Sequence, residues 1–275
     1  MSRMMHDTAR TLFSEPRTSA ASLAISILAV SLMAGATIEA QGRGGRQGGA
    51  PGQPATAQAA APIDLSGDWV AVISEDWRWR MITPAPGDYA SIPLTPEGLK
   101  VADSWDPARD EAAGEQCRSY GAPGLMRGPV RLRIGWLDPG TLKVETDYGM
   151  QTRLFHFSDR TPPGGRPTWQ GHSVAKWQMR SGRGAQNAPA TGNLAVVTTG
   201  LRPGYLRKNG VPYSADARLT EFWDMAVEAD GTRWIVITSI VHDPRYLLLP
   251  FTTALHFKQE ADGAKWDPTP CNARW

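Results

Sequence analysis

The sequence lacks most of the motifs that mark common chemistries. Only two of its 275 residues are cysteine and five are histidine. No CxxC or HxxxH spacing occurs, so there is no local zinc motif, and the G-x-S-x-G turn of many serine hydrolases is absent. Lysine and arginine (29) almost balance aspartate and glutamate (27), which argues against a nucleic-acid-binding surface. We therefore predict no metal, no cofactor and no nucleic-acid partner.

Long hydrophobic runs are also absent, apart from one near the start. Residues 21–36, ASLAISILAVSLMAGA, are uncharged and follow a stretch that contains Arg3, Arg10 and Arg17. A basic start, a short apolar run and small residues are typical of a secretory signal. We predict a signal peptide over 1–40, cleaved near Ala40, and a periplasmic or secreted protein with no stable membrane insertion after cleavage. The alternative is an uncleaved N-terminal anchor.

The mature part divides into a tether and one domain. Residues 41–62 are Gly, Gln, Ala and Pro with little to bury, which is typical of a disordered linker. Residues 63–275 have the length of a single domain. An even pair of cysteines in an exported chain favours a disulfide between Cys117 and Cys271. Two free thiols are the alternative.

The apolar residues of the domain recur with period 2, which indicates half-buried β-strands. Turn sequences such as DPG at 138–140 and ADG at 229–231 separate the strands. The predicted strands are 67–81, 130–137, 141–148, 150–157, 172–179, 193–200, 217–227, 233–241 and 252–259.

One helix is expected, in LTPEGLKVADSW, with Thr95 as N-cap and Pro96 at the first position. The absence of a βαβ rhythm argues against a parallel sheet. The sequence therefore predicts an all-β fold, an antiparallel up-and-down barrel with one short helix. A β-sandwich is the alternative.

Two short motifs resemble those of lipocalins: GDW at 67–69 and TDY at 146–148. Larger blocks, among them GHSVAKW, NLAVVTTG and HDPRYLLLPF, resemble a group of exported bacterial proteins that have no assigned reaction. This resemblance covers roughly residues 63–271. It implies an exported β-rich fold and no catalytic assignment.

Three residues are candidate acids or bases. His172 begins a strand after a glycine, and an imidazole near a carboxylate titrates in a useful range. Glu75 and Glu221 each interrupt an apolar strand face, where desolvation raises the pKa of a carboxyl group. The alternatives for both glutamates are an ion pair with Arg78, Arg80, Arg131 or Arg153, or a strand end that faces water. His156 and His256 are a further pair, able to share a metal only if they meet across the barrel.

The stretch SEDWRWRM alternates aromatic and basic residues. As a strand, it would place the tryptophans on one face and the arginines on the other; arginines facing a cavity would favour an anionic ligand. The basic loop 202–213 either covers the barrel mouth or is a hairpin loop. The segment HDPRY at 242–246, which contains Asp243, is either a plain turn or part of a site. The candidate ligand-binding residues are Trp77, Trp79, Arg78, Arg80, Trp223 and Tyr205.

These features predict a barrel that binds a small, largely apolar or aromatic organic ligand. One alternative is an enzyme on the same barrel, a lyase, isomerase or hydrolase that uses His and Glu as general acid and base. Another is a glycan-binding sandwich with exposed tryptophan platforms.

Overall fold

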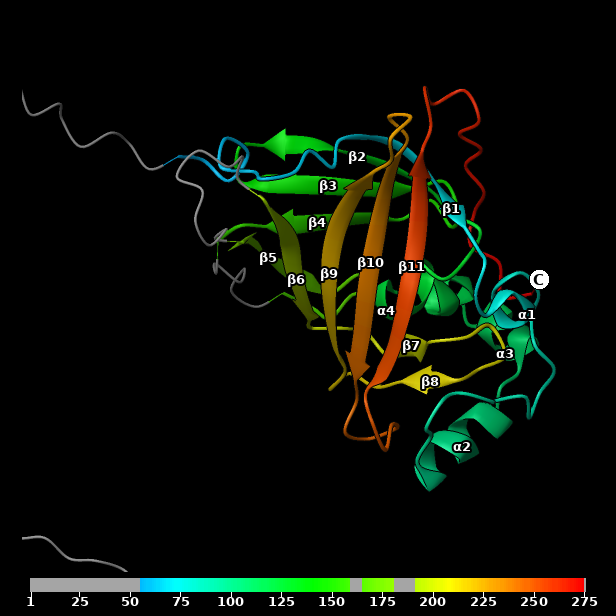
Figure 1. Ribbon diagram of the computed structural model, residues 1–275. Helices are drawn as coiled ribbons and strands as arrows, with labels where there is room; N and C mark the ends of the chain where they lie inside the picture. Colours follow the sequence, from blue (N-terminus) through cyan, green and yellow to red (C-terminus); the bar gives the residue numbers. More distant parts are fainter. Residues whose placement is uncertain (1–54, 159–164, 181–190, 275) are drawn as a thin grey trace, which may run out of the picture. The chain divides into compact units, whose positions relative to one another are not determined.

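A computed structural model describes residues 55–158, 165–180 and 191–274 (Figure 1). The predicted signal peptide and most of the predicted linker lie outside these residues. Within the described part, no helix is long and apolar enough to cross a membrane.

Nine strands of the described part close into a barrel, in the order β1-β11-β10-β9-β6-β5-β4-β3-β2. Apart from the two-stranded β7–β8 hairpin, this is the order of the chain, so the expected all-β barrel is confirmed. The barrel strands are β1 (Gly67–Val72), β2 (Arg131–Asp138), β3 (Thr141–Thr146), β4 (Thr152–His156), β5 (His172–Arg180), β6 (Thr191–Thr199), β9 (Arg218–Val227), β10 (Arg233–His242) and β11 (Phe251–Gln259).

The expectation of a wholly antiparallel barrel is wrong at one seam. Strands β4 and β5 are parallel, with Phe155 opposite Ser173 and His156 opposite Val174. All other neighbouring pairs in the barrel are antiparallel. A parallel pair needs a crossover that returns the chain to the end where the first strand began. Periodicity within each strand does not reveal the relative direction of two neighbouring strands.

Alternate strand residues fill the barrel interior with large side chains. Trp69, Phe155, Trp223 and Phe257 are all 0% exposed, and belong to one packed cluster. Phe155 and Trp223 meet edge to face, with ring centroids 5.3 Å apart. The interior around these four side chains therefore serves as a packed core.

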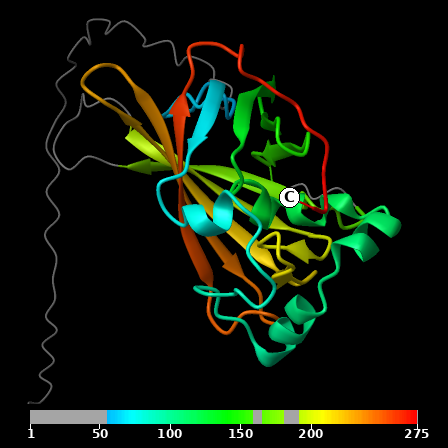
Figure 2. The same ribbon diagram turned by 90° about the vertical axis from the view of Figure 1, so that its right-hand side faces the viewer.

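Short helices and the β7–β8 hairpin gather at the barrel end where β1 ends and β2 begins (Figures 1 and 2). The predicted helix is confirmed, since Thr95 accepts a hydrogen bond from the Gly98 N–H and Pro96 opens the helix. The other helices were not predicted, although Asp106 and Pro107 open α3 with the same N-cap and proline pattern as Thr95 and Pro96. The elements at this end are α1 (Trp77–Arg80), α2 (Pro96–Asp103), α3 (Pro107–Ala112), η1 (Gln116–Tyr120), α4 (Ala122–Leu125), β7 (Gly204–Tyr205) and β8 (Pro212–Tyr213).

The predicted strand over 67–81 is wrong in its second half. Strand β1 ends at Val72, and WRWR forms the helical turn α1. Asp76, with φ +54°, adopts a left-handed conformation that ends any extended run, and its carbonyl accepts from the Trp79 and Arg80 N–H groups. Successive side chains point to opposite faces in a strand, but they do not alternate in this way in a helical turn. The tryptophans and arginines therefore point in different directions from those a strand would give.

The predicted disulfide is confirmed: Cys117 and Cys271 are bonded, with their Cα atoms 5.1 Å apart. The linker, by contrast, does not extend to residue 62. The Ala57 carbonyl accepts a hydrogen bond from the Trp177 indole, and the Gln58 N–H donates to the Pro139 carbonyl. Residues 57 and 58 of the predicted linker thus contact the barrel, at Trp177 of β5 and at Pro139 between β2 and β3.

Candidate anion-binding site

A narrow recess lies between the helical elements and the β7–β8 hairpin. We call it the basic cleft and define it by Trp79, Arg80, Arg127, Tyr148, Arg207 and Lys208, which line it together with Ile82, Ser119, Gly124, Gly128 and Leu206. Arg80 comes from α1, Arg127 from the turn after α4, and Arg207 and Lys208 from the hairpin between β7 and β8. Segments far apart in the sequence thus place four cationic side chains around one recess.

Arg207 is the least compensated of these cations. The residue is 3% exposed, and its Nε, Nη1 and Nη2 atoms have no hydrogen-bond partner in the described part of the chain. Its guanidinium lies over the Trp79 ring, 4.8 Å from the centroid. Burial and, next, the charge of Arg127 lower the pKa of Arg207 to about 10. A buried cation that retains all its hydrogen-bond donors is costly unless an anion binds there.

Arg80 and Arg127 are held by partners but keep part of their donor capacity. Arg80, 4% exposed, donates from Nε to the Arg127 carbonyl (2.9 Å) and from Nη1 to Glu75 (2.7 Å), while Nη2 has no partner among the described residues. Arg127 pairs with Asp76 at 3.3 Å. Burial and, next, the Arg127 charge lower the pKa of Arg80. The two guanidinium groups therefore repel each other across the recess.

Lys208 adds an amine at the tyrosine side of the cleft. Its Nζ donates to the Tyr120 hydroxyl at 3.1 Å and lies 4.7 Å from the ring centroids of both Tyr120 and Tyr148. Burial lowers the pKa of Lys208 from 10.5 to about 6. Burial also raises the pKa values of Tyr120 and Tyr148, so both hydroxyls stay protonated at neutral pH.

The dimensions of the cleft limit what can enter it. Its volume is about 360 Å³, part of which is open solvent, so a compact group such as a carboxylate or phosphate suits it. A larger ligand would have to extend outwards past Trp79 and the exposed Ile82.

Two of the predicted ligand-binding residues lie in this cleft and four lie elsewhere. Trp79 and Arg80 line it. Trp77 is 63% exposed, and the exposed Arg78 pairs with Asp88 at 2.5 Å. Trp223 is buried in the barrel core, and the Tyr205 hydroxyl donates to Asp110 at 2.8 Å.

The three candidate acids or bases are not brought together. Glu221 lies inside the barrel as a two-pronged ion pair with Arg153, at 2.9 and 2.6 Å, which is one of the alternatives left open by the sequence. Glu75 lies on the loop after β1, beside Arg80 and 3.4 Å from His256 Nδ1. Burial raises the pKa of Glu75, but the Ser74 hydrogen bond and the charges of Arg80 and His256 outweigh this effect. The net shift is downwards, against the expected rise.

His172 stacks on His156 on the neighbouring strand, with ring centroids 5.2 Å apart. Burial, and then His156, lowers the pKa of His172. The condition for a metal shared by His156 and His256, a meeting across the barrel, is not fulfilled. Their neighbours Phe155, Leu255 and Phe257 point into the core, so both histidines point outwards. No group of three or more His, Cys, Asp or Glu residues in the described ranges has metal-binding geometry.

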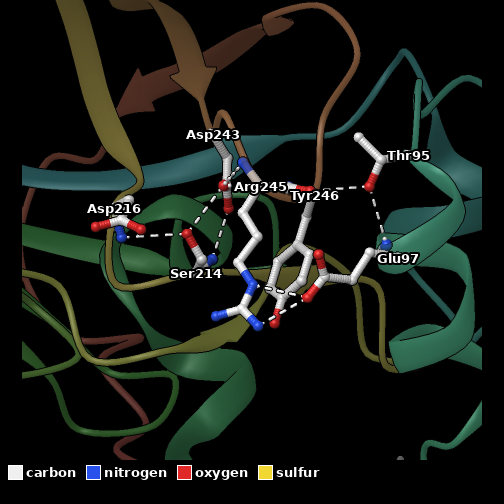
Figure 3. A network of polar contacts seen from close by, with 8 residues as sticks. Thr95, Glu97, Ser214, Asp216, Asp243, Arg245 and Tyr246 are labelled. Atoms are coloured by element: carbon white, nitrogen blue, oxygen red, sulfur yellow. Dashed lines mark hydrogen bonds and ion pairs between the residues drawn. The ribbon is translucent and has the colours of Figure 1, made fainter.

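The HDPRY segment is a structural corner (Figure 3). Asp243, 1% exposed, accepts hydrogen bonds from the backbone N–H and hydroxyl of Ser214 and from the Arg245 and Tyr246 N–H groups. Arg245 in turn pairs with Glu97 of α2. Four donors of the protein occupy the Asp243 carboxylate, which links the end of β10 to the segment after β8, while the Arg245–Glu97 pair links the same turn to α2.

Comparison of the chain with family models, with curated proteins and with solved structures finds no match. The site must therefore be interpreted from its own chemistry. Sequence reasoning missed Arg127, Tyr148, Arg207 and Lys208 as members of one site. The basic composition of loop 202–213 was the available signal, because Arg207 and Lys208 belong to it.

Proposed function

We propose that this protein binds a small organic anion, with its carboxylate or phosphate group in the basic cleft and its apolar part along Trp79 and Ile82. The observation that carries the proposal is Arg207, a buried guanidinium whose three nitrogen atoms have no hydrogen-bond partner among the described residues. Arg80 and Arg127 supply further charge. A preformed set of buried donors favours an anion because the desolvation cost has already been met on folding.

The balance of charges supports the same conclusion. Glu75 and Asp76 each pair with one cleft arginine, and Asp88 is occupied by Arg78 and the Trp79 indole. Arg207 forms no such pair within the described residues. An anion of charge −1 or −2 would relieve the repulsion that Arg127 exerts on both Arg80 and Arg207.

We further propose that the protein acts outside the cytoplasm, as a periplasmic or secreted binder. The Cys117–Cys271 disulfide supports this location, because such bonds persist mainly in oxidising compartments. Acid–base catalysis by His172, Glu75 and Glu221 gains no support, because the three residues lie in three separate places.

Thermal unfolding and calorimetry with matched ligands test the binding proposal. Benzoate and phenyl phosphate should raise the melting temperature, whereas neutral benzyl alcohol should not. A ligand at 100 times its Kd stabilises the fold by about 2.7 kcal/mol. Arg207→Met should remove the effect, and Arg78→Met is the control, because Arg78 lies on the same helix as Arg80 but outside the cleft. Equal stabilisation of the Arg207→Met variant, or by the neutral ligand, would contradict the proposal.

A further inference from the structure

The basic cleft contains a group that simple anion binding does not require, the amine of Lys208. Three arginines already supply permanent positive charge there. Lys208 differs from them because an amine that has lost its proton has a nucleophilic lone pair. Its position also differs, since its Nζ is held against the Tyr120 hydroxyl between two tyrosine rings.

We propose that Lys208 forms an imine with the carbonyl carbon of a 2-oxo acid whose carboxylate is bound by the arginines of the basic cleft. The proposal rests on the anion site proposed above. Arg207 and Lys208 are adjacent in the chain and line the same narrow recess. The carboxylate and carbonyl carbon of a 2-oxo acid are adjacent as well, so one ligand can meet both side chains in this small space.

The step balances with groups at hand. The Nζ lone pair attacks the carbonyl carbon, a C–N bond forms, and the carbonyl oxygen takes up a proton to give a carbinolamine. Loss of that oxygen as water then forms the C=N bond, and no oxidant or reductant is needed. The Tyr120 hydroxyl, 3.1 Å from Nζ, is placed to pass a proton during dehydration. The protonated imine carries its positive charge next to the bound carboxylate.

Burial favours the neutral form of Lys208 near pH 7, whereas an ordinary lysine is almost entirely protonated there. A desolvated pocket is one of the usual means of activating a lysine nucleophile. The tyrosines stay protonated, so they do not restore the ammonium form by forming an ion pair.

Reductive trapping tests the proposal. The protein is incubated near pH 6.5 with glyoxylate, pyruvate or phenylpyruvate and sodium cyanoborohydride, and adducts are located by intact-mass and peptide mass spectrometry. We expect a single adduct, at Lys208, that is absent from Lys208→Arg. Arg207→Met should reduce trapping by roughly tenfold or more, because the carboxylate loses its anchor. Lys100→Arg, which changes an exposed lysine on α2, should leave trapping unchanged.

Two controls separate this inference from the anion site. Benzoate should compete with trapping, and thermal unfolding of Lys208→Arg should show that the variant is folded. Benzoate binding without an adduct from any of the three oxo acids would overturn the imine and leave the anion site intact. Failure of benzoate to bind would overturn the anion site itself. Adducts spread evenly over surface lysines would also overturn the assignment to Lys208.

Discussion

One guanidinium, that of Arg207, dominates the electrostatics of the cleft. It is buried over Trp79, and its donors are unused by the described protein groups. Such a group lowers the stability of the ligand-free fold, because water solvates it in the unfolded chain and no hydrogen-bond acceptor among the described residues replaces that water on folding. Binding sites often contain such a destabilising group, because a bound ligand supplies the interactions that the free protein lacks.

Replacing Arg207 by methionine should therefore stabilise the ligand-free protein while removing anion binding. We expect the free energy of unfolding to rise by about 1–3 kcal/mol, the usual penalty of an unsatisfied buried polar group. Urea denaturation of both proteins without added anions measures this change. Arg78→Met, on the exposed side of α1, should change stability little. A large loss of stability in Arg207→Met would show that the guanidinium is compensated.

Lys208 should make anion affinity depend on pH. Burial holds its pKa near 6, so the ammonium form is present below that value and is lost as the pH rises through it. Loss of a positive charge weakens anion binding, and the affinity for benzoate should fall between roughly pH 5 and 7. At higher pH it should reach a plateau set by the arginines. Calorimetric titration of the wild type and of Lys208→Met checks this, because the variant should show little change over the range.

Inside the barrel, Glu221 and Arg153 form an ion pair with side chains that are 1% and 0% exposed. Removal of one partner leaves an unpaired buried charge, so Glu221→Gln should cost about 3–5 kcal/mol of stability in urea denaturation. Glu145→Gln, which breaks the partly exposed pair with Lys143, should cost less than about 1 kcal/mol. Similar losses in the two variants would contradict this account.

Some residue contacts could be predicted from the sequence and others could not. The interruption of an apolar strand face by Glu221 was visible, and its pairing with Arg153 was one of the alternatives. Arg127 and Arg207 were not recognisable as one site, because they are 80 positions apart and lie outside the barrel strands. Nothing in local periodicity determines which loops meet at a barrel end.

At the scale of elements, strand prediction succeeded where the alternation is long and bounded by turns, as in β9 and β10. It failed at β1 because Trp-Arg-Trp-Arg continues the apolar–polar alternation while the backbone turns at Asp76. The short helix α1 is fixed by its tertiary partners. Its Arg80 bonds to the Arg127 carbonyl 47 positions later, and such a contact overrides a local pattern.

The contact between α4 and β7 forms one wall of the cleft and depends on Gly124. A Cβ there would lie 2.6 Å from the Tyr205 carbonyl oxygen, which is backbone and cannot move aside. Gly124→Ala should therefore destabilise the fold by about 1–3 kcal/mol and weaken anion binding. Gly135→Ala is the control, because a Cβ on that glycine of β2 meets nothing within 4 Å. Thermal unfolding and benzoate titration of both variants test the difference, and equal behaviour would contradict it.

At the scale of the whole domain, the disulfide joins the helical end of the barrel to the C-terminal segment across 154 positions. Cys117 lies in η1, three residues before Tyr120, and the Asn272 N–H donates to the Tyr120 hydroxyl at 3.2 Å. Tyr120 in turn accepts from Lys208. The covalent bond therefore stabilises the fold and also supports the tyrosine side of the cleft.

Replacing both cysteines by serine should test these two roles together. A long closed loop restricts the unfolded chain, and loss of such a bond costs about 2–5 kcal/mol, so the melting temperature should fall. Benzoate affinity should also fall, because Tyr120 loses the support of the C-terminal segment. Wild-type protein under strong reducing agent is the matched control and should reproduce both effects. A double variant with a lower melting temperature but unchanged affinity would show that Tyr120 and Lys208 are held by η1 and the hairpin alone.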